Sequence, residues 1–91
     1  MKLSLQEDFG NTADILWALS SEIRLKILQI ISGDKEYRLK DLLPYIDCGM
    51  SNLSQQLKIL EDAGLIIKER VKDGSTSKLI RPVFDEIKIE L

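Results

Sequence analysis

The sequence contains no histidine and a single cysteine, Cys48, among its 91 residues. Histidine is the usual general base near neutral pH and the commonest transition-metal ligand, so its absence argues against an enzyme and against a zinc-type site. One cysteine cannot form an internal disulfide, which fits the reducing environment of the cytoplasm. We therefore expect no enzyme activity, no metal site, no cofactor and a cytoplasmic location.

Long apolar runs are missing as well. No run approaches the roughly 18 residues that a membrane span requires, so we expect no contact with a membrane. The apolar content of 44% is nevertheless enough for a core, and the charged content of 31% suits a protein that is dissolved in water. A chain of this length is the size of one domain. We expect residues 1–91 to form a single domain that begins with an N-terminal arm over residues 1–10.

The spacing of apolar residues in the first third of the chain is typical of helices. One apolar stripe predicts a helix over about 13–19, for which Thr12 can serve as the N-terminal cap. A second stripe predicts a helix over about 22–32, capped by Ser20 or Ser21. These two helices precede every other predicted element.

Residues 37–39 resemble a very short strand, and the segment 40–46 has the apolar spacing of a third helix. Pro44 falls within that helix, so it must lie in the first turn, or the helix must be short and bent. A tight turn follows, and a fourth helix is predicted over about 50–63. Gly64 stands at the position where a glycine commonly ends a helix.

Beyond the fourth helix the pattern changes to the alternation that is typical of strands. The stretches LIIKERVK and SKLIRPV flank Asp73-Gly74, a turn signal, and together they predict a hairpin over 65–82. Pro82 restricts the second strand to an edge or marks its end. The tail, 83–91, fits both a helical stripe and a third strand, and we favour a helix or an irregular tail.

The predicted order is helix, helix, short strand, helix, turn, helix and hairpin. This order indicates a winged helix-turn-helix, a mainly α fold with a small β-hairpin wing (α+β), in which residues 40–63 are the helix-turn-helix and 65–82 the wing. In that fold the second helix of the motif enters the major groove of DNA, and the wing reaches the adjacent backbone.

The fourth helix has two different faces when its residues are placed about 100° apart. Leucines form one stripe, and the opposite face carries side chains that can bind base edges and phosphates. Asn52 and Gln55 have amides suited to adenine, whereas Ser51 lies near the helix start and suits a phosphate. The alternative is that these residues only coat a solvated helix. The predicted DNA-binding residues of this helix are Ser51, Asn52, Gln55 and Lys58.

The charge distribution complicates a DNA-binding function, because the formal net charge is −2 and the pI is about 5.1. Residues 50–81, however, contain six basic and four acidic residues, which gives 6 − 4 = +2 and leaves −4 on the rest of the chain. We expect Arg70, Lys72 and Lys78 of the wing to contact phosphates. The alternative is a solvated hairpin with a chance surplus of positive charge.

Two stretches, MSNLSQQLKILEDAGLIIKERVKDG and ILWALSSEIRLKILQII, resemble the core of the ArsR-type winged-helix regulators. The resemblance implies a sequence-specific regulator of transcription that binds double-stranded DNA and pairs as a homodimer through its terminal helices. Gln56 stands where many relatives have histidine, and YRLKDLL lacks the cysteine pair of metal-sensing members. Metal sensing in the manner of those members therefore has no ligands.

The alternative function is a winged helix that contacts other proteins, which the acidic pI would suit. Two further residues have mainly structural interpretations. We expect Cys48 to be a buried apolar residue rather than a redox sensor. We expect Trp17 to belong to the core or to the dimer interface.

Overall fold

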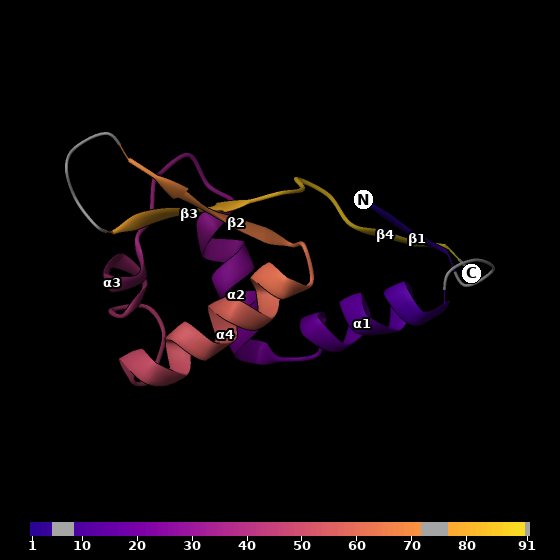
Figure 1. The fold of residues 1–91 in the computed structure, drawn as a ribbon, viewed down its shortest axis with the longest axis horizontal. Helices are drawn as coiled ribbons and strands as arrows, with labels where there is room; N and C mark the ends of the chain where they lie inside the picture. The colour runs from indigo at the N-terminus through magenta and orange to yellow at the C-terminus, as the bar shows by residue number, and fades with distance from the viewer. Residues whose placement is uncertain (5–8, 72–76, 91) are drawn as a thin grey trace.

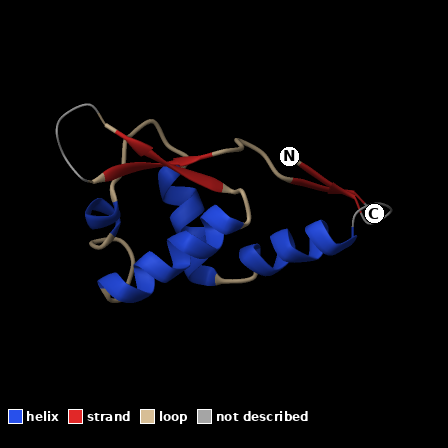
Figure 2. Ribbon diagram, viewed as in Figure 1, coloured by secondary structure: helices blue, strands red, loops and turns tan. Residues whose placement is uncertain are grey.

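The computed structural model describes residues 1–4, 9–71 and 77–90. Within these residues the chain forms four helices, an antiparallel hairpin and a second small pair of strands, arranged as in Figures 1 and 2. The predicted fold class, a mainly α winged helix-turn-helix with a β-hairpin wing, is confirmed. The elements in chain order are β1 (Lys2–Ser4), α1 (Phe9–Leu19), α2 (Glu22–Ile31), α3 (Leu39–Leu42), α4 (Met50–Asp62), β2 (Ile66–Arg70), β3 (Lys78–Pro82) and β4 (Lys88–Glu90).

The core lies where α2, α3 and α4 meet the β2–β3 hairpin. The leucine stripe of α4 is fully enclosed, since Leu53, Leu57 and Leu60 each have 0% of their surface exposed. Ile27 of α2 and Leu42 of α3 are equally enclosed. Each such side chain contributes roughly 1.5–3 kcal/mol through burial, so the stripe fixes which face of α4 points outward.

The start of α2 follows its sequence signal, whereas the start of α1 does not. Ser21 is the cap of α2, and its hydroxyl accepts a hydrogen bond from the backbone N–H of Arg24 at 3.4 Å. Helix α1 begins at Phe9 rather than at 13, so the prediction of Thr12 as its cap is wrong. Thr12 lies inside the helix and is buried, because α1 turns that side towards the rest of the protein.

Helix α3 is shorter than the sequence indicated. It ends at Leu42, and the chain turns over 43–45. Pro44 therefore lies beyond the helix, which agrees with its inability to donate an intrahelical hydrogen bond. The short strand expected over 37–39 is a single β-bridge, in which the N–H of Ile80 donates to the carbonyl of Tyr37 at 2.8 Å.

Helix α4 ends at a glycine, as the sequence predicted. Gly64 has a φ of +77°, a left-handed conformation that favours glycine. The N–H of Gly64 donates to the carbonyl of Glu61 at 2.9 Å, and that of Leu65 donates to the carbonyl of Leu60 at 3.0 Å. These two bonds form a Schellman motif, which turns the chain directly from α4 into the wing.

The wing is an antiparallel hairpin whose register runs from Ile66 opposite Pro82 to Arg70 opposite Lys78. Pro82 is the last residue of β3, as expected from its missing N–H. The predicted turn at Asp73-Gly74 lies outside the described residues.

The tail contradicts the sequence prediction of a helix or an irregular segment. Residues 88–90 form β4, which runs parallel to β1 with Leu3 opposite Ile89. The N-terminal arm supplies the partner strand, a pairing across nearly the whole chain that local periodicity cannot reveal. In Figure 1, β1 and β4 lie together above α1, at the end of the molecule away from the wing.

Two glycines provide a test of the backbone geometry. A Cβ added at Gly64 or at Gly10 of α1 would meet no atom within 4 Å, so the two sites differ in conformation rather than in space. Gly64→Ala should lower the free energy of unfolding by about 1–2 kcal/mol, because alanine resists a positive φ. Gly10→Ala should leave it unchanged or raise it by up to about 1 kcal/mol, because alanine favours a helix. Urea denaturation distinguishes these signs, and equal effects would contradict the assigned turn.

Candidate nucleic-acid interface

The outward side of α4 carries all four polar residues that the sequence singled out. Ser51, Asn52, Gln55 and Lys58 are exposed and lie opposite the buried leucine stripe. We call these four residues the α4 outer face. The N-cap of α4 is Gly49, which has no side chain to accept hydrogen bonds from the first backbone N–H groups. The α4 outer face therefore combines exposed polar side chains with a helix N-terminus that can attract an anion.

A buried arginine lies behind this helix. Arg24 of α2 is 7% exposed. Its Nε donates to the carbonyl of Ala18 at 2.6 Å, and its Nη2 donates to the carbonyl of Trp17 at 3.2 Å. Both carbonyls belong to the last turn of α1, where backbone acceptors lack helical partners and the helix dipole is negative. The guanidinium carbon also lies 4.9 Å from the centre of the Trp17 ring, at cation–π distance.

The same guanidinium reaches α4. Arg24 Nη1 donates to Gln56 Oε1 at 2.7 Å, and Gln56 Nε2 donates to Asn52 Oδ1 at 3.0 Å. A continuous hydrogen-bonded chain thus runs from the interior to the α4 outer face. Sequence reasoning missed this role of Arg24 and Gln56, because the partners are 32 residues apart. The available signal in the sequence was Gln56 itself, a polar residue on the flank of α4 one helical turn after Asn52.

The cations of α4 and the wing divide into paired and unpaired groups. Lys58 lies 3.7 Å from Asp62, and Lys68 lies 3.5 Å from Glu61. Arg81 binds two carboxylates, Glu69 at 2.5 Å and Glu36 at 3.1 Å. Hydrogen bonds from Arg81 to Glu69 and then to Glu36 raise the pKa of its guanidinium above the ordinary value. Each of these three cations therefore has at least one acidic neighbour.

Arg70 and Lys78 are the exception on the wing. They face each other in the antiparallel register, both are exposed, and neither has an acidic partner among residues 1–4, 9–71 and 77–90. Like charges directly opposite each other destabilise a strand pair, so an anion bound between them would relieve the repulsion. Lys72 lies outside the described residues, and its assignment stays a prediction. Among the described wing residues, the cations without an acidic partner are thus those farthest along the strands from Ile66 and Pro82.

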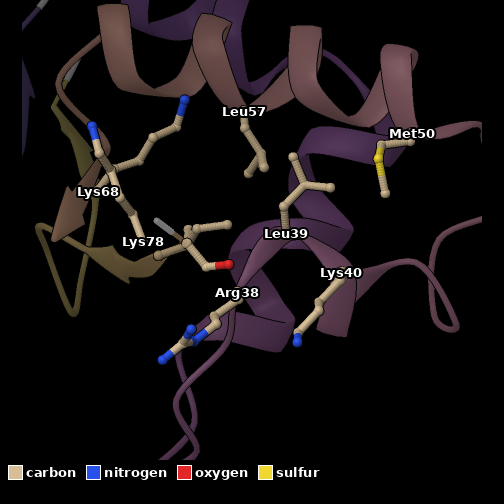
Figure 3. Close-up of a pocket in the computed structure, with 9 residues that line it drawn as sticks. Arg38, Leu39, Lys40, Met50, Leu57, Lys68 and Lys78 are labelled. Carbon is tan, nitrogen blue, oxygen red and sulfur yellow. The ribbon is translucent and has the colours of Figure 1, made fainter. Parts of the chain in front are cut away.

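A groove separates the wing from α3 and α4 and has a volume of about 410 Å³. Leu39 and Leu57 contribute apolar surface to its lining, and Figure 3 shows them pointing towards each other, with basic side chains at one side and below. The basic residues that line it are Arg38, Lys40, Lys68 and Lys78. Arg38 and Lys40 were not among the predicted site residues. The cations of YRLKD, at the start of the helix-turn-helix, were the signal for them.

Two residues with mainly structural interpretations remain, Cys48 and Trp17. Cys48 is half-buried and packs against the core, so it is less enclosed than expected. Trp17 is 60% exposed, which rules out a core position within one chain and leaves the interface interpretation. In the part of the chain that the structure describes, no group of three or more histidine, cysteine, aspartate or glutamate residues could hold a metal ion.

Comparison with known proteins gives one family and several structures. Residues 21–68, more than half of the chain, match the model of a family described as bacterial regulatory protein, arsR family. No curated protein matches the chain.

Three solved structures share the fold. An ArsR-like transcriptional regulator from Rhodococcus sp. RHA1 is 21% identical with a TM-score of 0.71, and the match covers 82% of this chain and 65% of that one, less than two thirds. Rv0081 of M. tuberculosis is 22% identical with a TM-score of 0.72, covering 84% and 73%. The homodimeric winged helix-turn-helix DNA-binding domain of Mb0332 from Mycobacterium bovis is 21% identical with a TM-score of 0.72, covering 84% and 67%.

The hydrogen bonds of Arg24 lead to a stability prediction. Arg24→Lys keeps the charge but cannot reach three acceptors with a planar fork, so it should lower the free energy of unfolding by about 1–3 kcal/mol. Arg70→Lys is the matched control, because Arg70 is exposed and has no described partner, and it should change stability by less than about 0.5 kcal/mol. Thermal or urea denaturation checks both. Equal stabilities of the two variants would show that the Arg24 fork does not link the helices.

Proposed function

The chain belongs to the ArsR family of bacterial regulatory proteins, whose model it matches over residues 21–68, and we propose that it regulates transcription by binding specific sites on double-stranded DNA. Residues 40–63 act as the helix-turn-helix and 65–82 as the wing, within one domain over 1–91. Helix α4 enters the major groove, and the wing follows the adjacent backbone. The family match supports this function, and no finding favours the alternative of a protein-interaction module.

One observation carries the proposal most directly. The repulsive cross-strand pair of Arg70 and Lys78 is unneutralised among the described residues, while the other described wing cations, Lys68 and Arg81, have acidic partners. Such an arrangement costs stability in the free protein, and phosphates of a DNA backbone would offset that cost. An acidic protein thus retains a local positive surface beside the α4 outer face.

The two parts of the surface divide the work. An α-helix fits the major groove, where side-chain amides and hydroxyls reach base edges. Gln55 projects from the middle of the α4 outer face and is our principal reader of sequence. Ser51 and the free N–H groups at the start of α4 suit a phosphate. Lys40 and Lys78 line different sides of the protein groove in Figure 3, and both suit the phosphates of the DNA backbone.

We further infer a homodimer. Two half-sites give a small DNA reader its affinity and specificity, and the structure of Mb0332 is described as homodimeric. Exposed apolar side chains lie on α1 and β4, the elements at one end of the molecule (Figure 1), with Phe9 67% and Trp17 60% exposed on α1 and Ile89 52% exposed on β4. Because the described tail is a strand, pairing involves α1 and the terminal strands rather than two terminal helices.

Catalysis is not part of the proposal, since the family and the fold are those of transcriptional regulators. We infer that a DNA-binding regulator of this family works in the cytoplasm, which also suits the single free thiol. Within the described ranges, no helix has the length and apolar character needed to cross a membrane.

Two substitutions test the division of work. Gln55→Ala should lose about 1–3 kcal/mol of discrimination between specific and random duplexes, with the salt dependence of binding unchanged. Lys78→Ala should weaken binding to all duplexes alike and lower the slope of log K against log salt by about 1. Fluorescence anisotropy at several salt concentrations measures both quantities. Wild-type behaviour of both variants would replace this proposal with the protein-interaction alternative.

Arg81→Ala is the matched control for Lys78→Ala, because both cations lie on β3 and only Arg81 is held by two carboxylates. Removing Arg81 also leaves two carboxylates without their partner. The slope of log K against log salt should therefore not fall by the amount expected for the loss of one phosphate contact. If Arg81→Ala and Lys78→Ala lower the slope equally, the pairing of wing charges does not select the phosphate contacts.

The homodimer leads to a separate prediction. Light scattering at tens of micromolar should give about twice the mass of the 10.4 kDa chain. Phe9→Ser should raise the dissociation constant of the dimer at least about tenfold, since burying a phenylalanine is worth roughly 1.5–3 kcal/mol. Tyr45→Ser is the control, because Tyr45 is similarly exposed but follows α3. A monomeric wild type, or equal effects of the two variants, would contradict the assigned interface.

A further inference from the structure

Asn52 is the one residue of the α4 outer face whose amide takes part in a hydrogen-bonded chain that begins in the interior. The chain runs from Arg24 Nη1 to Gln56 Oε1 over 2.7 Å, and from Gln56 Nε2 to Asn52 Oδ1 over 3.0 Å. Arg24 is buried, Gln56 half-buried and Asn52 exposed. Along this series of hydrogen bonds, each donor lies on the core side and each acceptor on the surface side.

The chemistry of arginine determines that direction. A guanidinium can only donate hydrogen bonds, so the atom of Gln56 that faces Arg24 must be its carbonyl oxygen. The NH₂ of Gln56 then faces Asn52 and needs an acceptor, which is the Asn52 Oδ1. The orientation of both amides thus follows from donor and acceptor chemistry, and it does not depend on telling oxygen from nitrogen by shape.

The guanidinium itself cannot easily turn away. Its Nε is bound to the carbonyl of Ala18 at 2.6 Å and its Nη2 to that of Trp17 at 3.2 Å, in a buried position against the Trp17 ring. Breaking these bonds to reorient Nη1 would leave buried polar groups without partners, which is costly. The end of α1 and helix α2 therefore hold the Gln56 amide in one orientation.

We propose that Arg24 and Gln56 are positioning residues that make Asn52 a hydrogen-bond donor towards DNA. With Oδ1 directed at Gln56, the end of Asn52 left for DNA is its Nδ2 amine. This group matches a base that offers only acceptors in the major groove, which is guanine with O6 and N7 or thymine with O4, whereas adenine presents an amine donor beside its N7. The bidentate pairing with adenine expected from the sequence needs both Oδ1 and Nδ2 to face the base, whereas here Oδ1 is turned towards Gln56.

This inference rests on the proposed function, because it requires α4 to lie in the major groove. It adds a base preference at one position of each half-site, and it assigns that preference to residues that do not touch DNA. Gln55, which has no described bond to this chain of residues, reads its base independently.

The test is selection of bound duplexes from random DNA by the full chain and four variants, one of which is Gln55→Ala. Asn52→Ala should lose base preference at one position per half-site, which identifies the position that Asn52 reads. At that position the wild-type protein should prefer guanine or thymine by about five- to over a hundredfold. Gln56→Leu releases Asn52, and the preference at that position should weaken.

Gln56→Glu is the decisive variant. The new carboxylate still accepts from Arg24 but cannot donate, so Asn52 should turn its Nδ2 inward and present Oδ1 to the DNA. The preferred base at the same position should change to adenine or cytosine, whose amines donate. The added negative charge lowers overall affinity but does not by itself reverse one base, and a loss of protein stability would not do so either.

The outcomes separate the two proposals. If Gln56→Glu selects the wild-type base, or if wild type selects adenine or cytosine at the Asn52 position, the positioning proposal is overturned. If Asn52→Ala leaves the selected sequence unchanged while Gln55→Ala alters it, the positioning proposal is wrong and the DNA-binding function stands. If wild type selects no sequence at all, the proposed function fails and the positioning proposal fails with it.

Discussion

A buried arginine that has no carboxylate partner among the described residues is the constraint on which the arrangement of the helices depends. Burying a charge is unfavourable unless its donors are satisfied, and Arg24 satisfies its fork with the last carbonyls of α1 and the amide of Gln56. Its own helix is α2, so one side chain fixes three helices relative to each other. The leucine stripe and the hydrogen bond from Arg24 to Gln56 therefore together fix which face of α4 points outward.

The charge pattern explains how a chain with a net charge of −2 can serve as a DNA-binding protein. Acidic residues pair with Lys68 and Arg81 near the body of the wing, whereas Arg70 and Lys78 have no acidic partner within the part of the chain that the structure describes. The resulting positive surface is small, so attraction to any duplex should be modest. Recognition of DNA then relies on how closely α4 fits the major groove and on the direction of each hydrogen bond to the bases. This dependence favours specific over non-specific sites.

Much of the fold could be predicted because local signals agreed with the tertiary packing. The α4 stripe and Gly64 define that helix through burial and a left-handed turn, and both are visible in the sequence. The predictions failed where distant residues decide the structure. The tail became a strand because the N-terminal arm pairs with it, and α1 extends to Phe9, ahead of its predicted start. The link between Arg24 and Gln56 has no local signature, so the orientation of Asn52 required the structure.

The most direct test of the account is an NMR titration of the isotope-labelled protein with a duplex selected from random DNA. The account predicts that the side-chain amide signals of Asn52 and Gln55 and the backbone signals of Arg70 and Lys78 shift on binding. Signals from the exposed side of α2, such as Lys26, should stay in place. Shifts confined to α1 and β4, with the α4 outer face and the wing unaffected, would contradict it.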